Sequence, residues 1–549
     1  MRSFQVFYGS SAKRRASRRQ ITLVFLAAAL LASPALMAAN GNLDTSFNGG
    51  VFDLPIGDRI LSLTLQDDGR VLLAGQFSYT TDPSTEWMLA RRNTDGTPDA
   101  SFGVGTGQVA IPVGGDRPSG RDSGIAGVVV QSDGKILGVG WGLDRTGTIY
   151  DVHLIRWNPD GSLDTSYGKT GKLTTSLGTS GQATAVALQQ DGKAVVTAYQ
   201  VGASPSDPTQ PVVLRYTKSG GLDASFGTAG VFRLPGSVPA AEFGVTSSAT
   251  IQPDGKILVG MGSEQNNHPE IMRLTATGQL DSTFGSGGIV ALNVGSSAAS
   301  GITVQPDGKI LLSSWLVGGP GKVFRLLASG ALDTSFNGQG WIDLVVFQTI
   351  ENLALAPTGQ VLVVGFTGGG GLWMARLTSN GQLDASFTNG TRSGMLETDS
   401  PDQGNPAVVL QGVNLQPDGR FVVAGGPTAA RFQGDALDLL PKTAAFTSAT
   451  GVPLSTVQVS NVITISGLTT GAWVPIQVFG GSYSINGDPF TSMMGYVHDG
   501  DQVMVDHTSA ATHGTSVTTT LRVGGLSAPN SPWILRGSKV IATFTSTTQ

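Results

Sequence analysis

The feature that most constrains this chain is an arginine followed, eight positions later, by an Asp that opens the pattern Asp-x-Ser/Thr-Phe/Tyr. The pairing occurs six times, as Arg91/Asp99, Arg156/Asp164, Arg215/Asp223, Arg273/Asp281, Arg325/Asp333 and Arg376/Asp384. A seventh arginine, Arg431, has no such Asp downstream, and a seventh pattern, which begins at Asp44, has no such Arg upstream. A linear array has no reason to leave half a unit at each end, whereas a closed ring does. We therefore predict a closed ring in which Asp44 lies beside Arg431 in the same way as Asp99 lies beside Arg91.

Each repeat also carries one hairpin signal. The Asp pattern recurs at intervals of 51 to 65 residues, and between successive patterns lies a turn such as Gln-Asp-Asp-Gly at 66–69 or Gln-Pro-Asp-Gly at 305–308. Asp-Gly between two apolar runs is the strongest short-range sign of a β-hairpin, because glycine adopts the positive φ that the turn requires. The Asp pattern and the hairpin signal each occur seven times.

One repeat resolves into four short strands, expected at 50–55, 60–66, 70–77 and 87–93. Their apolar, β-branched runs are typical of strands buried on both faces. Four strands per repeat, seven times over, predict an all-β fold with a seven-bladed β-propeller at residues 40–438. We expect the N-terminal segment 42–54 to close the ring by completing the last blade. A β-helix is the alternative, but its rungs are shorter and lack hairpin turns.

The repeat pattern stops after Asp438, and residues 443–549 alternate in a different way. Short alternating runs such as Val462 to Ile465 are separated by turn signals at Asn486-Gly487 and Asp499-Gly500. Short strands without any helical period predict an immunoglobulin-like β-sandwich for this segment.

Residues 1–39 have the pattern of a signal peptide. A basic region at 13–19 precedes the apolar stretch 21–31, and small residues at 35–39 supply a cleavage zone. The apolar stretch is about half the roughly 20 residues that a membrane helix needs. The sequence around Arg18-Arg19 also resembles a twin-arginine export signal. We expect an exported protein, periplasmic or secreted, with no membrane insertion once the signal is removed.

Composition excludes several classes of function. The chain has no Cys, so disulfides, thiolate catalysis and Cys-ligated zinc are ruled out. Its net charge is −5, and removal of the signal segment, with its six basic and no acidic residues, leaves −11. Nucleic-acid partners are disfavoured because they require a basic surface. The turns offer one or two acids each, which is too few for a calcium loop. Of the five histidines, the three in the tail, His498, His507 and His513, are predicted to lie on the polar surface rather than in a metal cluster. No metal, cofactor or catalytic residue is expected.

The residues resemble a known repeat family. Leu-Asp-x-Ser-Phe-Gly at 222–227, Gln-Pro-Asp-Gly-Lys-Ile-Leu at 252–258 and Ala-Arg-Leu at 375–377 are similar to the bacterial delta-60 repeat. Departures from the pattern are mild: Pro98 stands for Leu, Tyr167 for Phe and Thr358 for Asp. The resemblance covers about residues 40–435 and implies β-propellers in exported or surface proteins of largely unassigned role. The segment 481–487 is similar to Ig-like modules of bacterial surface proteins.

The seven Arg and seven Asp side chains admit two interpretations. A ring of them could bind a ligand, since Arg suits planar anions and clustered Asp suits calcium. The same spacing in every repeat favours instead a structural role, in which each Arg pairs with its Asp between strands. We predict structural pairs, including Arg431 with Asp44.

Function is expected on the opposite face of the propeller. Strands in a blade alternate in direction, so the uniform Asp-Gly turns and Asp-x-Ser-Phe connections share one face and the irregular loops share the other. Loops held by a rigid scaffold are the usual place for a binding site. The candidate residues on that face are Trp141, Asp144, Tyr150, Asp207, Glu264, His268, Trp315 and Asp402.

These observations predict an exported, non-enzymatic binding or scaffold protein whose partner is a protein or glycan of the cell envelope. One alternative is a secreted polysaccharide hydrolase or lyase, which would need two carboxylates about 5–10 Å apart in a cleft. The other is a purely structural component of the cell surface, which would have no pocket.

Overall fold

The computed structural model describes most of the chain beyond the N-terminal segment. The described residues are 41–54, 59–78, 85–113, 123–144, 146–204, 207, 209–235, 245–263, 268–295, 298–315, 319–367, 372–388, 393–398, 410–528 and 531–549. The predicted signal peptide, residues 1–39, lies outside them.

The described residues form 39 strands and no helix, so the prediction of an all-β chain is confirmed. Because they contain no helix, none of these residues belongs to a helix that could cross a membrane.

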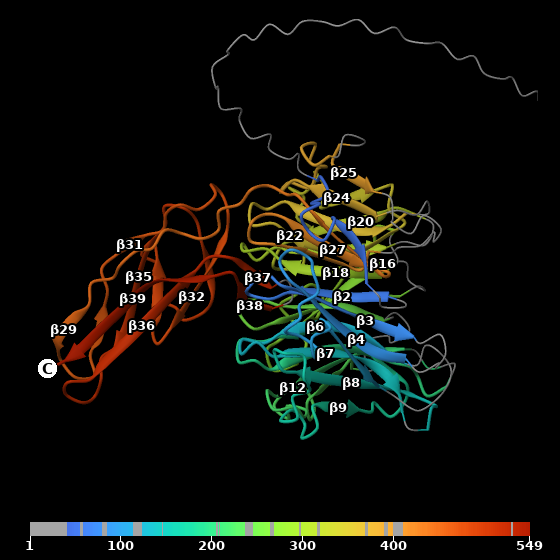
Figure 1. Ribbon diagram of the computed structural model, residues 1–549, viewed down its shortest axis with the longest axis horizontal. Helices are drawn as coiled ribbons and strands as arrows, with labels where there is room; N and C mark the ends of the chain where they lie inside the picture. The colour runs from blue at the N-terminus through green and yellow to red at the C-terminus, as the bar shows by residue number, and fades with distance from the viewer. Residues whose placement is uncertain are drawn as a thin grey trace, which may run out of the picture. The chain divides into compact units, whose positions relative to one another are not determined.

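Up to residue 432 the strands form seven antiparallel meanders of four strands each, which we call blades and number from the N-terminus (Figure 1). Blade 1 consists of β2 (Arg59–Leu65), β3 (Val71–Ser78), β4 (Thr85–Arg92) and β5 (Gln108–Pro112). Blade 2 consists of β6 (Ser123–Val130), β7 (Ile136–Leu143), β8 (Tyr150–Trp157) and β9 (Lys172–Thr175). Blade 3 consists of β10 (Gly181–Leu188), β11 (Ala194–Gln200), β12 (Gln210–Tyr216) and β13 (Val231–Arg233). Blade 4 consists of β14 (Val245–Ile251), β15 (Ile257–Ser263), β16 (His268–Leu274) and β17 (Ile289–Ala291). Blade 5 consists of β18 (Ala298–Val304), β19 (Ile310–Trp315), β20 (Gly321–Leu326) and β21 (Trp341–Leu344). Blade 6 consists of β22 (Thr349–Leu355), β23 (Val361–Phe366), β24 (Leu372–Leu377) and β25 (Met395–Thr398). A single pair, Gly262 with Ala298, joins blades 4 and 5 into one eight-stranded sheet.

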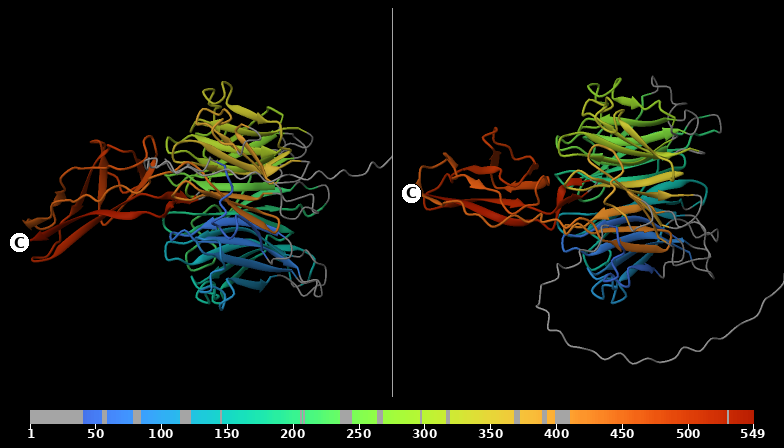
Figure 2. Two further views of the ribbon diagram at one scale, coloured as in Figure 1. Left: turned by 45° about the horizontal axis from the view of Figure 1, so that its top comes forward. Right: turned by 90° about the horizontal axis from the view of Figure 1, so that it is seen from above.

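Blade 7 combines the two ends of the propeller sequence. Its strands are β26 (Gly412–Leu415), β27 (Phe421–Gly425), β28 (Thr428–Phe432) and, from the N-terminus, β1 (Val51–Asp53). Strand β1 pairs with β28 and not with β2, so the repeat in the sequence is offset from the blade by one strand. Figure 2 shows the blue N-terminal strands beside the orange strands of blade 7.

The Asp-Gly turns join the first two strands of the blades. In blade 1 the amide of Gln66 donates to the carbonyl of Arg70 at 2.9 Å, and Gly69 has a φ of 83°. A side chain other than that of glycine is strained at this φ, which explains why the last turn residue is Gly in all seven hairpins.

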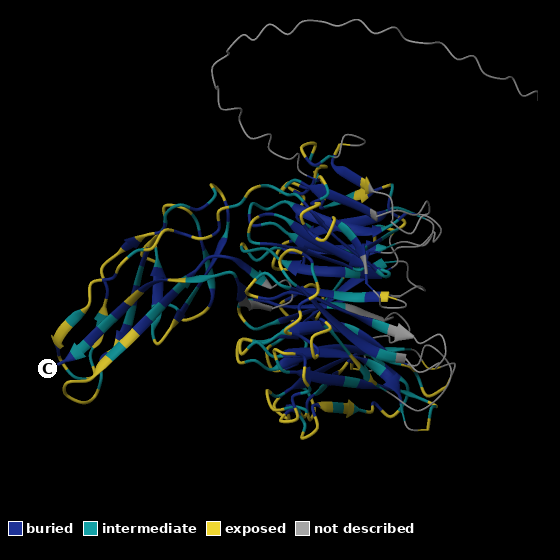
Figure 3. Cartoon of the chain, in the orientation of Figure 1, coloured by how far each residue is buried: buried dark blue, intermediate teal, exposed yellow. Residues whose placement is uncertain are grey.

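The apolar core lies between neighbouring blades. Leu72 and Trp87 of blade 1, for example, share one buried cluster with Ile125, Ile136 and Trp157 of blade 2. Figure 3 shows that the propeller strands are buried over most of their length while the connecting turns are more exposed. A blade therefore buries both faces only when it has a neighbour on each side, as in other repeat folds.

The C-terminal module contains two sheets and a separate hairpin. The first sheet is β29 (Ala449–Val452), β39 (Lys539–Thr548), β36 (Ser516–Val523), β32 (Val474–Phe479) and β34 (Gly495–Val497), and the second is β30 (Val457–Val459), β31 (Ile463–Thr464), β33 (Ser482–Ile485) and β35 (Gln502–Thr508). The hairpin is β37 (Leu526–Ala528) with β38 (Ser531–Arg536). The immunoglobulin-like assignment of residues 443–549 stays a prediction.

The predicted surface position of the histidines is wrong for His507. Its side chain is only 5% exposed and contacts Thr519 Oγ1 and Ser546 Oγ, each at 2.7 Å. Burial lowers the pKa of His507, which favours the neutral ring. Sequence alternation placed this residue on the outer face, but β35 faces the core of the module there.

Candidate functional site

The seven Arg–Asp pairs share one geometry. In every blade the arginine Nε donates to Oδ2 of the Asp. The distances are 2.6 Å for Arg91–Asp99, 2.7 Å for Arg156–Asp164, 2.8 Å for Arg215–Asp223, Arg273–Asp281, Arg325–Asp333 and Arg376–Asp384, and 2.7 Å for Arg431–Asp44. Asp44 thus accepts the same hydrogen bond from Arg431, 387 positions away, as Asp99 accepts from Arg91.

Each arginine also ties its blade to the next one. The guanidinium of Arg156 in blade 2 donates to the carbonyl of Lys218 in blade 3 at 2.6 Å, and Arg431 in blade 7 donates to Thr94 in blade 1 at 2.6 Å. The aromatic ring of the Asp pattern packs under the guanidinium, with 4.3 Å between Arg431 Cζ and the centre of the Phe47 ring. In blade 6 the carboxylate of Asp435 replaces the carbonyl, 3.3 Å from Arg376. The bonds form a complete circle through the described residues, which accounts for the fixed spacing.

A second cation contacts most of these aspartates, and sequence reasoning missed it. The residue after each Asp-Gly turn is Lys or Arg in six repeats, and Lys256, for example, lies 3.1 Å from Asp281. Burial by itself raises the pKa of Asp281, but hydrogen bonds from Thr283 and Lys256 and the charge of Arg273 outweigh it and hold the pKa well below its usual range. The recurring Gly-Lys/Arg step was the sequence signal that could have identified this contact.

Arg273→Ala is expected to lower the free energy of unfolding by about 3–5 kcal/mol, because it leaves the carboxylate of Asp281 buried without its main partner. Lys256→Ala removes the partly exposed cation from the same carboxylate and should cost only about 0–1 kcal/mol. Thermal melts of the two variants, followed by circular dichroism, make the comparison. Equal melting temperatures for Arg273→Ala and the unmodified chain would assign this arginine a role other than folding.

The structure does not gather the eight candidate residues of the irregular-loop face into one site. Trp141, Asp144 and Tyr150 are in blade 2, Asp207 follows the second strand of blade 3, His268 begins the third strand of blade 4 and Trp315 ends the second strand of blade 5. Glu264 and Asp402 lie outside the described residues.

Several of these side chains already contact nearby residues of the same loop or strand. Asp144 is held in its own turn, where Oδ2 accepts from Thr146 Oγ1 at 2.6 Å. Asp207 accepts from the amide of Ser204 at 2.9 Å. His268 Nδ1 lies 3.6 Å from Glu270 Oε1. Among the described candidates only Trp315 lines the central channel of the propeller.

The channel is lined by the innermost strand of every blade. In six of these strands, β2, β6, β10, β14, β18 and β22, the register with the second strand shifts at the same level, which marks a β-bulge. In blade 7 the amide of Gln411, just before β26, donates to Ala424 at that level. Bulges redirect side chains and are frequent beside active sites. Here they direct one residue per blade towards the axis, and the described ones that line the channel are Leu61, Ala126, Thr184, Ser300, Glu351 and Gln411.

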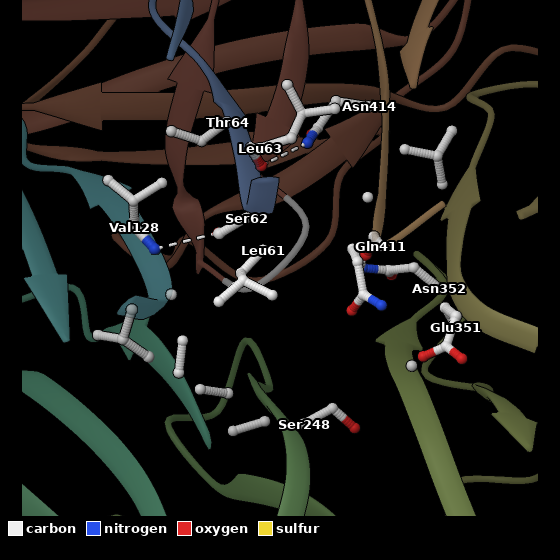
Figure 4. A pocket seen from close by; sticks show the side chains of 18 of the residues that line it. Leu61, Ser62, Leu63, Thr64, Val128, Ser248, Glu351, Asn352, Gln411 and Asn414 are labelled. Carbon is white, nitrogen blue, oxygen red and sulfur yellow. Dashed lines mark hydrogen bonds between the residues drawn. The ribbon is translucent and has the colours of Figure 1, made fainter. Parts of the chain in front are cut away.

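The channel contains a cavity of about 280 Å³ (Figure 4). Its polar lining also ties blades together: the amide of Val128 donates to Ser62 Oγ at 3.2 Å, and Asn352 Nδ2 donates to the carbonyl of Gln411 at 3.2 Å. Figure 4 shows Glu351 on β22 and Gln411 just before the neighbouring strand β26, with both side chains beside the open space. The cavity therefore has a rigid wall of mostly neutral polar groups.

Glu351 is the one acidic side chain among the described residues that line this cavity. It occupies the bulge of β22, between the paired residues Ile350 and Asn352. Burial raises the pKa of Glu351, because the charged carboxylate loses water at this position. In the described part of the chain no Lys, Arg or His forms an ion pair with it. Sequence analysis missed Glu351, although a signal exists. Glu351 lies five residues before the turn residue Ala356, the same spacing as between Leu61 and Gln66.

The inner end of the cavity is formed by Arg536 from strand β38 of the C-terminal module. Its side chain is 5% exposed and donates to Asn414 Oδ1 of blade 7 at 2.9 Å and to Thr64 Oγ1 of blade 1 at 2.7 Å. Both acceptors are near the Asp-Gly turns, so the hairpin enters from the turn face. Burial lowers the pKa of Arg536 to about 10. Arg536 was also missed, because it is far in sequence from every repeat.

A second, smaller cavity of about 90 Å³ lies on the other side of Arg536. Pro306 and Pro357 of the propeller turns and Trp473 and Tyr496 of the C-terminal module line it. The amide of Trp473 donates to the carbonyl of Pro357 at 2.9 Å. The C-terminal module thus covers part of the turn face, and a ligand of the larger cavity would enter from the irregular-loop face.

The chemistry of the channel suits binding. Neutral hydroxyl and amide groups can hold a polar ligand, and one carboxylate can accept hydrogen bonds or balance a positive charge. Within the described ranges no three His, Asp or Glu side chains come together as a metal-binding group.

Comparison with known proteins gives a family of repeats. Five segments, residues 66–102, 131–167, 252–284, 305–336 and 356–387, match the family model described as "Domain of unknown function (DUF5122) beta-propeller". No curated protein matches the sequence. The family match, together with the arrangement of the sheets, confirms the predicted β-propeller of delta-60-like repeats.

Several solved structures resemble the chain at low identity. YCF48 from Cyanidioschyzon merolae is 12% identical with a TM-score of 0.39, and the match covers 70% of this chain and 99% of that one. The PQQ-bound aldose sugar dehydrogenase from Streptomyces coelicolor is 14% identical with a TM-score of 0.34, over 56% of this chain and 94% of that one. The α-L-arabinofuranosidase Arb93A from Fusarium graminearum is 10% identical with a TM-score of 0.36, over 57% and 91%. Likenesses this distant assign no activity to this chain.

Proposed function

The chain contains repeats of the DUF5122 β-propeller family, and from that premise we propose that it is an exported, non-enzymatic binding protein. Its ligand enters the central channel from the irregular-loop face and is a small polar molecule, or the end of a glycan or protein of the cell envelope. Export is supported by the signal-peptide pattern of residues 1–39.

The observation that carries this proposal is the cavity itself. Repeat scaffolding alone has no need for a ring of bulges around an open cavity of about 280 Å³, with polar side chains at four of the six described bulge positions that line it. Ligand sites for small molecules commonly have volumes of about 300–1,000 Å³ with a few well-placed polar groups. The cavity is slightly smaller than that range, which favours a compact ligand.

The alternative is hydrolysis or lysis of a polysaccharide. Glu351, with its raised pKa, would suit a general acid, but the two-carboxylate mechanism of most glycosidases requires a second Asp or Glu about 5–10 Å away. Among the described residues that line the cavity Glu351 has no such acidic neighbour. Incubation with envelope polysaccharides, with detection of new reducing ends, tests this alternative directly.

A thermal-shift panel tests the binding proposal. Neutral sugars, amino sugars, amines, amino acids and carboxylates are each added to the chain without its signal peptide. A true ligand at 100 times its Kd adds about 2.7 kcal/mol of stability, which should raise the melting temperature by a few degrees. Ala126→Phe, which fills the channel at a bulge position, should remove that shift while the variant keeps its own cooperative melt.

The proposal fails if no compound class stabilises the unmodified chain, or if the stabilisation is the same in Ala126→Phe. In the first case a purely structural surface role becomes the better account.

A further inference from the structure

The two charged side chains of the channel, Glu351 and Arg536, lie at different levels along its axis. Glu351 is at the level of the bulges, whereas Arg536 is fixed at Thr64, three residues further along β2 from the bulged Leu61. At about 3.3 Å per residue, the two levels are about 10 Å apart. Every other described side chain that lines the cavity is neutral. The channel therefore has an acidic outer end and a basic inner end.

The outer end lacks a countercharge of its own. A half-buried carboxylate is costly unless a cation or several donors compensate it. The side-chain amide of Asn352 already donates to the backbone carbonyl of Gln411. A hydrogen bond from Thr349 offsets only part of the burial that raises the pKa of Glu351. A ligand that carries a positive charge would offset the cost at Glu351.

An indole ring belongs to the same wall. Trp315 ends strand β19 of blade 5, pairs with Ala298 and lines the cavity together with Glu351. Strand β19 packs against β22, which carries Glu351. Trp is the best side chain for attracting a cation to its ring face. An aromatic ring and a carboxylate in the wall of one cavity are a combination suited to an organic ammonium group.

The inner end restricts the rest of the ligand. The guanidinium of Arg536 donates to Asn414 and Thr64, and its Nε has no hydrogen-bond partner among the described residues. Its charge repels a second cation and leaves a donor for an acceptor atom. A compound with a positive charge at both ends is therefore disfavoured.

We propose that Glu351 and Trp315 bind the ammonium group of a small organic compound with one positive charge, whose other end is neutral or anionic and faces Arg536. This inference rests on the proposed binding function and names the chemical class of its ligand.

Isothermal titration of the chain without its signal peptide tests the proposal. The probes are choline, n-butylammonium, 4-aminobutyrate, the dication butane-1,4-diammonium and neutral glucose. We expect binding of at least one of the first three, and binding of the dication at least about tenfold weaker than that of n-butylammonium. Glu351→Gln, which keeps the shape of the side chain, should weaken ammonium binding by at least about tenfold. Trp315→Leu should weaken it by about two- to tenfold.

The matched control is Glu397→Gln, the same substitution at an exposed position of the outer strand β25 of the same blade. It should leave the affinity unchanged, which shows that loss in Glu351→Gln is local. The proposal is overturned if ammonium affinity survives Glu351→Gln, if the dication binds as tightly as n-butylammonium, or if glucose alone binds. Glucose binding would overturn the ammonium assignment and leave the channel as a binding site, whereas failure of every compound in the thermal-shift panel would remove both.

Discussion

Deletion of residues 41–54 is expected to abolish the cooperative fold of the propeller. The deletion removes strand β1 and the buried side chains of Phe47, Phe52 and Leu54, each worth about 1.5–3 kcal/mol. It also leaves Arg431 buried without Asp44, at a cost of about 3–5 kcal/mol. The total is comparable to the whole stability of a typical domain, about 5–15 kcal/mol. Near-UV circular dichroism and limited proteolysis should show a chain without fixed packing.

A synthetic peptide of residues 41–54 provides the control. Added in excess, it should restore the near-UV signal, because β1 binds blade 7 through main-chain pairs with β28 and through Asp44. The same peptide with Asp44→Ala should restore much less. A truncated chain that melts at the same temperature and with the same sharpness as the complete one would contradict closure by the N-terminal strand.

Acid is expected to unfold the propeller steeply below about pH 4. All seven ring aspartates have a pKa lowered from 3.8 in the folded chain: Asp44, Asp99, Asp164, Asp223, Asp281, Asp333 and Asp384. A carboxyl group whose folded pKa lies below its unfolded pKa stabilises the fold at every pH above the unfolded value. That stabilisation is lost as the pH falls through the interval between the two values, because the unfolded chain takes up the proton first.

The size of this effect follows from the number of groups. Each lowered aspartate adds at most about 1.4 kcal/mol per pH unit to the slope, and solvent screening reduces this limit. Urea melts at several pH values between 2 and 7 measure the slope. Asp281→Asn removes one titrating group. It should reduce the contribution of the ring aspartates to the slope by about one part in seven and also lower the stability at neutral pH. A stability that stays flat from pH 5 to pH 2 would contradict the role assigned to the pairs.

The Arg–Asp pairs illustrate what local sequence can predict. Hairpin turns depend on the φ that Gly69 and its counterparts adopt, and strand burial depends on apolar residues in short runs, so both are visible in a window of a few residues. Repetition then supplies the long-range information: the unmatched Arg431 and Asp44 indicate a contact across 387 positions that no single repeat reveals.

The channel illustrates the opposite case. Glu351 faces the axis because β22 carries a bulge beside it, and a bulge changes the side to which a residue points without changing the composition of the strand. The eight residues selected on the irregular loops were chosen for chemistry and exposure, and of the described ones only Trp315 lies in the cavity wall. The bulge has the same spacing from the turn in these repeats, but the fact that it faces the axis follows from how seven sheets pack together.

The sequence by itself determined the all-β class, the repeat, the Arg–Asp pairing and the manner of closure, because each depends on turn chemistry and on contacts repeated in every unit. Only the tertiary structure decided where a ligand fits. The bulges place Glu351 in the channel, and a hairpin from the C-terminal module places Arg536 at its inner end, between Asn414 and Thr64. The bulge recurs in six blades, but a glutamate occupies it only at Glu351, and Arg536 comes from outside the repeats, so neither side chain belongs to the repeated pattern.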